Sequence, residues 1–297
     1  MFFAFRNQRG AIEVSGDEAG AFLNDLLTAE LAQLDVGSAR AACLLTPQGR
    51  ILFDMMVYRV RMDCYWLALD AAEVADFHKK LMMYRLRRPV HLAKLDMWQS
   101  AMLFGDDADK WQTEMQAETR TGAVYAFADP RDPALGVHLV SAEGRPEAPA
   151  SAQLCEEADW HKLRISRNVP EGAVDLARGR ALMLEAGLDK LAAVDFKKGC
   201  YIGQEVTART HYRGLVKRRI VPVYQAGGHL QTAQDIHKGE VAVGQILSCD
   251  AAGTMALASV RLDAIHACQA DAAGLLVGGA EIELRYPEDW PPLPALS

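Results

Sequence analysis

The stretch KKGCYIGQEVTARTHYRG, from Lys197 to Gly214, places one cysteine after two lysines and ahead of a glutamine–glutamate pair. The thiolate is the nucleophile or metal ligand, so the surroundings of Cys200 decide its reactivity. The residues after Gly199 predict the start of a helix. A helix N-terminus beside Lys198 would favour the thiolate. The alternative is that Cys200 is one more buried small residue, as most free cysteines are.

The polar residues after Cys200 have two interpretations. Glu205 and Arg209 lie four residues apart, so on a helix they form a stabilising pair without any further role. His211 and Arg213 follow that helix and precede a change in the character of the chain. Domain junctions often form clefts, so these two side chains are candidates for binding.

The segment ARAACLLTPQGRILFDMMVYRV (39–60) contains two apolar runs split by a Pro-Gln-Gly turn, which predicts a β-hairpin. On its second strand Asp54 shares a face with Met56 and Tyr58. A carboxylate among apolar residues is buried or faces a cavity, and burial would raise its pKa and suit it to proton transfer. The alternative is a strand-end carboxylate that the backbone or Arg50 satisfies.

The composition of the 297 residues is that of an ordinary globular protein. The net charge of −7 argues against general affinity for nucleic acid or an anionic membrane, and no apolar run is long enough to cross a bilayer. The N-terminus does not have the pattern of a signal peptide. Six scattered cysteines and scattered histidines predict free thiols in a reducing compartment and no resident metal site. These features predict bacterial cytoplasm, or the mitochondrial matrix if the protein is eukaryotic.

The chain changes character near residue 213. Before it, strand patterns alternate with helical ones, including a helix from Asp70 that Pro89 stops. After it, RRIVPVY, VAVGQILS, TMALASVRL and AEIELRY are separated by glycine-containing turns, which predicts an antiparallel β-barrel. We therefore expect an α+β body over residues 1–213 and a barrel domain over 214–297.

KGCYIGQEVTAR resembles the signature of the YgfZ family of folate-binding proteins, which are related to the aminomethyltransferase of glycine cleavage. The segments FLNDLLTAEL, ACLLTPQGRILFDMMVYR, LDKLAAVDFKKGCYIGQE, LASVRLD and PEDW resemble that family in the same order. The resemblance implies an aminomethyltransferase-like fold. In that fold two intertwined α/β domains surround a central folate-sized channel, and a C-terminal antiparallel β-barrel follows them.

The resemblance also implies a function. Proteins of this family bind tetrahydrofolate and support the assembly or repair of iron–sulfur clusters in client enzymes, including enzymes that modify tRNA. The resemblance makes Cys200 the key residue, either in transient contact with a cluster or persulfide or as a nucleophile toward a one-carbon unit on the folate. It also places Asp54 beside the folate. The residues expected to bind the folate are Asp54, Lys198, Tyr201, Gln204, Glu205, Arg209 and Arg213. The expected partners are folate and iron–sulfur client or assembly proteins, without direct nucleic-acid or membrane binding.

Two departures separate the chain from the aminomethyltransferases. Their strand carries a pair of aspartates where this chain has Phe53-Asp54, and their pterin-binding RxE motif corresponds here to Arg164-Ile165-Ser166, with Glu171 nearby. Two further readings stay open. The first is a folate-dependent one-carbon transferase with an unknown donor, and the second is an interaction scaffold without folate. Whether the protein catalyses any reaction is also left open.

Overall fold

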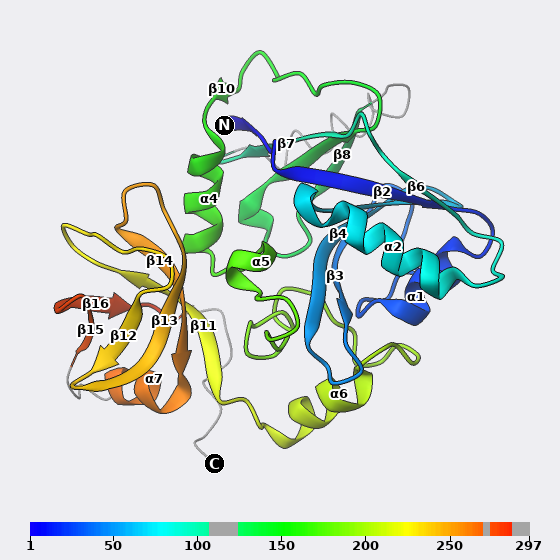
Figure 1. Ribbon diagram of the computed structural model, residues 1–297. Coiled ribbons are helices and arrows are strands. Elements are labelled where there is room, and N and C mark those ends of the chain that lie inside the picture. The colour runs from blue at the N-terminus through cyan, green and yellow to red at the C-terminus, as the bar shows by residue number, and fades with distance from the viewer. Residues whose placement is uncertain (107–123, 270–273, 287–297) are drawn as a thin grey trace.

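The computed structural model describes residues 1–106, 124–269 and 274–286 (Figure 1). The hairpin predicted over residues 39–60 is confirmed, and it lies at one edge of a five-stranded sheet with the order β3-β4-β5-β2-β6. Its strands are β2 (Arg9–Ser15), β3 (Ala39–Leu45), β4 (Ile51–Arg61), β5 (Cys64–Asp70) and β6 (His91–Lys94).

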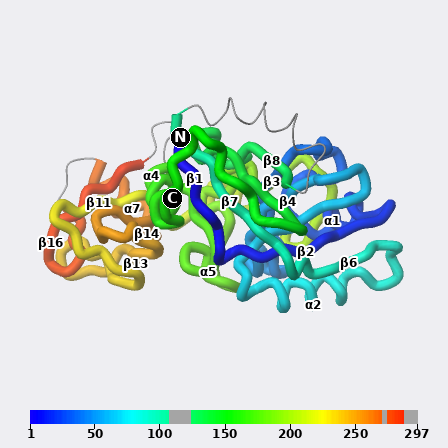
Figure 2. Tube along the Cα trace, turned by 90° about the horizontal axis from the view of Figure 1, so that it is seen from above, coloured from blue at the N-terminus to red at the C-terminus, as the bar shows by residue number. Residues whose placement is uncertain are grey.

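A second five-stranded sheet has the order β10-β1-β7-β9-β8. Its strands are β1 (Phe2–Phe5), β7 (Gln99–Phe104), β8 (Val124–Ala128), β9 (Val137–Ser141) and β10 (Gln153–Leu154). The chain thus enters this sheet with β1, crosses to the other sheet with β2, and returns with β7. Figure 2 shows the passage from β1 to β2. This crossing intertwines the two halves of the body.

Two helices, α1 (Ala19–Leu26) and α2 (Val74–Arg85), cover one face of the first sheet, and the other helices lie elsewhere in the structure. These other helices are α4 (Glu157–Ser166), α5 (Gly172–Asp175), α6 (Gln204–Arg213) and α7 (Leu262–Gln269), with short 3₁₀ helices at Ala71–Glu73 and Pro133–Leu135. Along β4, Phe53 and Met55 pack in one core cluster with Phe22 of α1 and Phe77 of α2. Tyr58 belongs to a different cluster. Successive side chains of a strand point to opposite faces of the sheet, so the first sheet has two apolar faces.

None of the described helices combines the length and apolar composition needed to span a membrane.

The last part of the chain forms a closed barrel with the strand order β11-β14-β13-β12-β15-β16. Its strands are β11 (Arg218–Tyr224), β12 (Asp235–Lys238), β13 (Val241–Cys249), β14 (Met255–Arg261), β15 (Leu275–Val277) and β16 (Ala280–Leu284). The predicted barrel is confirmed, although β12, β15 and α7 were not anticipated.

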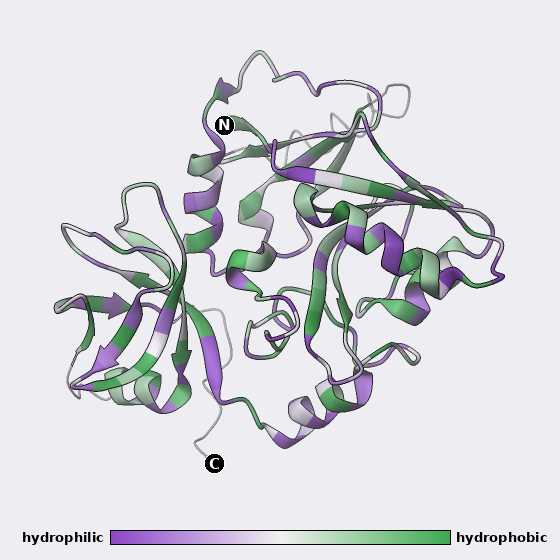
Figure 3. Ribbon diagram, in the orientation of Figure 1, coloured by the Kyte–Doolittle hydropathy of each residue, from purple (hydrophilic) through white to green (hydrophobic). Residues whose placement is uncertain are grey.

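Hydrophobic residues dominate β3 and β4 in Figure 3. The PEDW segment lies outside the described residues.

Candidate functional site

Asp54 lies on β4, on the face that packs with residues of the second sheet such as Phe127 and Val140. Its Oδ2 atom accepts a hydrogen bond from the backbone N–H of Gly172, at 3.1 Å. Burial raises the pKa of Asp54, while Arg9 opposes this shift. The expected raised pKa is confirmed. The alternative partner Arg50 instead donates to the carbonyl of Arg180.

Glu171, the residue before Gly172, is the centre of a buried ionic network. One carboxylate oxygen accepts from Arg6, and the other accepts from Nη1 of Arg131 at 2.8 Å. Arg131 also donates to Oδ2 of Asp129 through Nη2, at 2.7 Å. Burial would raise the pKa of Glu171, but Arg6, Arg9 and Arg131 together hold it well below its usual range. The network therefore keeps a carboxylate anion next to the peptide that binds Asp54.

Asp129 continues the network to a tyrosine in the core. Its Oδ2 atom lies 2.8 Å from Nε2 of His138, and Nδ1 of His138 lies 2.9 Å from the hydroxyl of Tyr58. Burial lowers the pKa of His138, whereas the neighbouring arginine and histidine hold the pKa of Asp129 below its usual range. A neutral histidine beside an anion donates through Nε2 and accepts through Nδ1. Tyr58 therefore donates to His138, and its oxygen lone pairs are free to accept.

Aromatic rings surround this end of the network. Ring centroids lie 4.8 Å apart for Tyr58 and Phe127, 5.7 Å for Trp66 and Trp98, and 5.1 Å for Trp66 and Tyr125. The indole N–H of Trp98 is buried and has no hydrogen-bond partner among the described residues. Buried donors are normally satisfied, so this indole N–H is available to donate a hydrogen bond to an acceptor atom of a bound molecule.

Tyr201 connects the cysteine loop to the same cluster. Its ring is 7% exposed and belongs to the cluster of Tyr58 and Trp98, and its hydroxyl also has no partner among the described residues. Burial, Asp195 and Cys43 raise the pKa of Tyr201 to about 12. Cys43 is the cross-strand partner of Asp54. The structure therefore brings Tyr201, Cys43 and Asp54 together.

Cys200 itself is exposed on the loop before α6. We predicted that it lies at the start of a helix, and this is wrong. The helix begins at Gln204, after Gly203, which has a φ of 81°. A left-handed residue at this place needs glycine, and it turns the chain sharply before the helix. Exposure of the thiol thus comes from the loop conformation.

The loop is anchored on the turn of the β3–β4 hairpin. A Cβ atom on Gly203 would lie 2.5 Å from the carbonyl oxygen of Thr46, and one on Gly49 would lie 3.2 Å from Oγ1 of Thr207. The two glycines allow these segments to touch, whereas a Cβ on Gly199 would meet nothing within 4 Å. The cysteine loop and the strand of Asp54 are therefore parts of one local structure.

Lys198 does not act beside the thiol as we expected. Its ammonium group donates to the carbonyls of Asn24, Leu27 and Ala29, each at 2.7 Å. An ammonium group has three donors, so these contacts use all of them. Burial lowers the pKa of Lys198 to about 8. The side chain ties the loop to the end of α1.

The remaining predicted residues lie on α6. Gln204 donates to the carbonyl of Gly199 at 3.4 Å, while Glu205, Arg209 and Arg213 are exposed. His211 stacks on Phe196 with ring centroids 3.9 Å apart. No described contact joins these side chains to Asp54, so their role in folate binding stays a prediction.

Most of the buried network was not predicted from the sequence. Tyr58, Asp129, Arg131 and His138 come from separate segments, and no local motif links them. Glu171 was noted only as an acid near the RxE position, and whether it replaces the missing glutamate was left open. Ser166 donates to the carbonyl of Leu163. Within the described ranges, no three histidine, cysteine or carboxylate side chains gather as a metal site.

Comparison with known proteins assigns both parts of the chain. Residues 7–123 match the family model of the GCVT N-terminal domain, and residues 217–292 match the CAF17 C-terminal beta-barrel domain. The crystal structure of the glycine cleavage system aminomethyltransferase T from Bartonella henselae superposes with a TM-score of 0.72 at 15% identity. This superposition covers 95% of this chain and 83% of that one, which confirms the predicted aminomethyltransferase-like fold.

Among curated proteins, the mitochondrial iron–sulfur cluster assembly factor IBA57 homolog of Neurospora crassa is 31% identical over 80% of this chain. The mitochondrial IBA57 proteins of Mus musculus and Homo sapiens are each 34% identical, over 74% and 72% of this chain. The chain spans 59%, 65% and 64% of the length of these three relatives. The chain therefore joins a region similar to the GCVT N-terminal domain to a CAF17-type C-terminal β-barrel, and its homologues are the IBA57 proteins.

Proposed function

We propose that this protein is a tetrahydrofolate-binding factor that supports the assembly or repair of iron–sulfur clusters in client enzymes. The observation that carries the proposal is the exposure of Cys200, since the other five cysteines are buried or partly buried. The printed names of the homologues, iron–sulfur cluster assembly factors, give this thiol its chemical context. The resemblance of KGCYIGQE to the YgfZ signature points the same way.

Cys200 would act as a transient ligand to iron. A cysteine binds iron as thiolate, so the thiol releases its proton on binding. Clusters need several thiolates, and the described residues contain no group of three or more histidine, cysteine or carboxylate side chains that could hold a metal ion. The other ligands would come from a client or assembly protein. A groove of about 590 Å³ beside the loop, lined by Glu30, Arg40 and Lys197 among others, offers space for that partner.

The residues between the two sheets fit a folate. The aromatic cluster suits a flat ring system, and the unpaired Trp98 indole and Tyr201 hydroxyl suit its acceptor atoms. A reduced folate supplies a one-carbon unit or reducing equivalents. On the protein side, the raised pKa of Asp54 suits the carboxyl to hydrogen-bond an amine and exchange a proton with it. The clients would include tRNA-modifying enzymes, in bacterial cytoplasm or, as for the named homologues, in mitochondria.

A folate-dependent one-carbon transferase with an unknown donor is the second candidate. The fold of aminomethyltransferase T and the position of Asp54 favour it. It predicts that purified protein alone turns over a methylene- or formyl-folate and that Asp54→Asn abolishes this turnover. The assembly proposal instead predicts a requirement for Cys200.

The test is rescue of cells that lack the protein. Wild type, Cys200→Ala and Cys268→Ala are expressed at matched levels, and the activities of several iron–sulfur enzymes are measured. We expect wild type and Cys268→Ala to restore these activities and Cys200→Ala to fail. Equal rescue by all three proteins would show that Cys200 is dispensable and would favour the one-carbon transferase as the function. No rescue by wild type would exclude the assembly role.

A further inference from the structure

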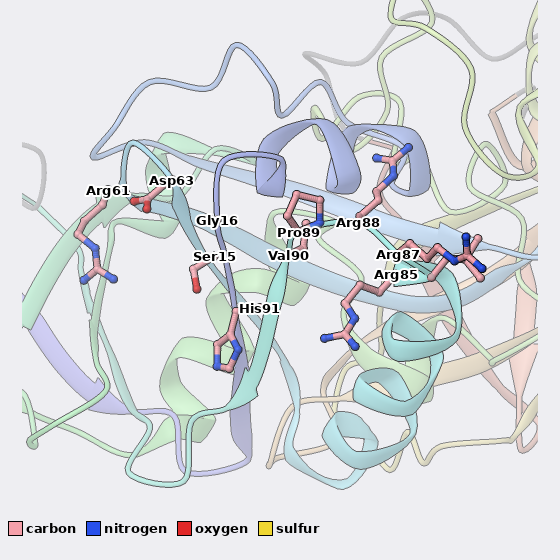
Figure 4. Close-up of a pocket in the computed structure, with 11 residues that line it drawn as sticks. Ser15, Gly16, Arg61, Asp63, Arg85, Arg87, Arg88, Pro89, Val90 and His91 are labelled. Carbon is pink, nitrogen blue, oxygen red and sulfur yellow. The ribbon is translucent and has the colours of Figure 1, made fainter.

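A basic groove lies at the C-terminal end of α2, and its lining includes neither Asp54 nor residues of the Glu171 network or the Cys200 loop (Figure 4). Its volume is about 750 Å³, and four arginines line it: Arg61, Arg85, Arg87 and Arg88. Figure 4 shows Arg61 on one side of Ser15 and His91, with the other three arginines on the opposite side. Two separate parts of the chain thus direct positive charge toward one surface.

Most of this charge has no ion-pair partner among the described residues. Arg88 binds Asp25 of α1 at 2.5 Å, but Arg61, Arg85 and Arg87 form no ion pair with any described carboxylate. Among the described residues that line the groove, Asp63 is the one acidic side chain. The chain carries a net charge of −7, so unpaired arginines are not explained by a shortage of acids. The groove is therefore complementary to an acidic surface outside this chain.

The turn inside the groove displays an apolar side chain at a conformational cost. Leu86 has φ 51° and ψ −114°, and the N–H of Arg88 donates to the carbonyl of Arg85 at 3.0 Å. These features describe a type II′ turn with leucine at the position that glycine prefers. The Leu86 side chain is 81% exposed, so burial does not offset the strain. Strained residues that packing does not explain are frequent in functional surfaces.

Apolar contacts distinguish a protein partner from nucleic acid. Exposed Met83 precedes this turn on α2, and exposed Met62 follows Arg61. Methionine and arginine are enriched at protein interfaces, whereas a phosphate backbone makes no use of apolar side chains. The overall negative charge also opposes binding to nucleic acid.

We propose that the groove lined by Arg61, Arg85, Leu86 and Arg87 docks an acidic segment of a partner protein that also carries apolar side chains. The arginines bind its carboxylates, and Leu86 packs against its apolar residues. Arg88 and Lys198 bind the same end of α1, through Asp25 and through the carbonyls of Asn24 and Leu27. The groove and the Cys200 loop are thus anchored to one helix end, although docking itself does not depend on the thiol.

The test measures fluorescence anisotropy with short labelled peptides. A Glu–Leu peptide is compared with a Gln–Leu peptide, a Glu–Ala peptide and a single-stranded RNA oligonucleotide. The double variant Arg85→Glu, Arg87→Glu is matched by Lys217→Glu, Arg261→Glu, which reverses two exposed charges on the barrel. We expect the wild type to prefer the Glu–Leu peptide and the groove variant to bind it at least about tenfold more weakly. The barrel variant and Cys200→Ala should bind it as the wild type does.

Leu86→Gly separates the apolar contact from folding. Glycine adopts the observed φ without strain, so this variant should be at least as stable as wild type. It should bind the Glu–Leu peptide more weakly and leave the Glu–Ala peptide unaffected. Tighter binding of the RNA through the same arginines would overturn the proposal in favour of nucleic acid. Equal binding by the groove and barrel variants, or no binding of the Glu–Leu peptide, would overturn the docking site itself.

Discussion

The ammonium group of Lys198 shows how a single residue can be misassigned from its neighbours in sequence. Only Gly199 separates it from Cys200, yet its side chain points to the end of α1 and satisfies three carbonyls there. Asp54 is the opposite case, because strand alternation alone placed it on the correct face. Backbone periodicity is visible in a sequence, whereas the direction of a long side chain depends on the tertiary contacts.

Replacement of Lys198 by methionine should destabilise the fold. It leaves three buried carbonyls without donors, and we expect a loss of about 3 kcal/mol in the free energy of unfolding. Urea denaturation checks this value. Lys197→Met changes an exposed neighbour and should cost less than about 0.5 kcal/mol. Similar losses for both variants would show that the carbonyl contacts contribute nothing specific.

Asp54→Asn should change how stability depends on pH. The pKa of Asp54 is raised by burial in the folded protein, so the folded state holds a proton that the unfolded state has lost. Its contribution to stability is therefore present below the ordinary aspartate pKa of about 4 and is lost as pH rises through the folded value. Asparagine keeps an oxygen for the Gly172 N–H but cannot ionise. The free energy of unfolding should fall less for the variant than for the wild type as the pH rises through this range. The same dependence on pH in both proteins would contradict the raised pKa of Asp54.

At the scale of elements, the hairpin, the helix before Pro89 and most barrel strands were predictable because each has a strong local pattern. The start of α6 was not, since YIG resembles a first helical turn and only contact with the hairpin fixes the φ of Gly203. The series of hydrogen bonds from Tyr58 through His138 to Asp129 could not be predicted from the sequence either. Its members are on β4, on β9 and just after β8, and the intertwined sheets bring them together.

Gly203→Ala tests the anchoring of the cysteine loop. The added Cβ would meet the Thr46 carbonyl in a conformation that alanine rarely adopts, so we expect a loss of about 1–3 kcal/mol. The rate of Cys200 alkylation by iodoacetamide should change as well, because the loop must move. Gly199→Ala is the matched control, since its Cβ has open space and should leave both quantities near the wild-type values. Equal effects at the two glycines would contradict the anchoring.

At the scale of the whole molecule, a buried ion pair of the body forms hydrogen bonds with Ser248 of the barrel. Nη1 of Arg164 on α4 donates to Oδ2 of Asp175 on α5 at 2.6 Å, and Oδ1 of Asp175 accepts from the N–H of Ser248 on β13 at 3.1 Å. Both ionic side chains are fully buried. The arginine of the supposed pterin motif thus holds the two parts together. The boundary between the two domains, which we place between residues 213 and 214, remains our proposal.

Asp175→Ala should therefore loosen the barrel. Loss of one partner leaves the buried Arg164 charge uncompensated, which costs about 3–5 kcal/mol. Limited proteolysis should cut between the body and the barrel faster than in the wild type. Asp263→Ala removes an exposed partner of Arg261 and should cost less than about 1 kcal/mol. An Asp175 variant as stable as the Asp263 variant would contradict this role.

In the proposed function, the Cys200 thiol is the group that acts in cluster assembly. The most direct test adds purified protein to an anaerobic extract of cells that lack it and measures the recovery of an iron–sulfur dehydratase. We predict recovery with wild type and with Cys268→Ala, and none with folded Cys200→Ala. Equal recovery with Cys200→Ala would show that cluster assembly does not need this thiol.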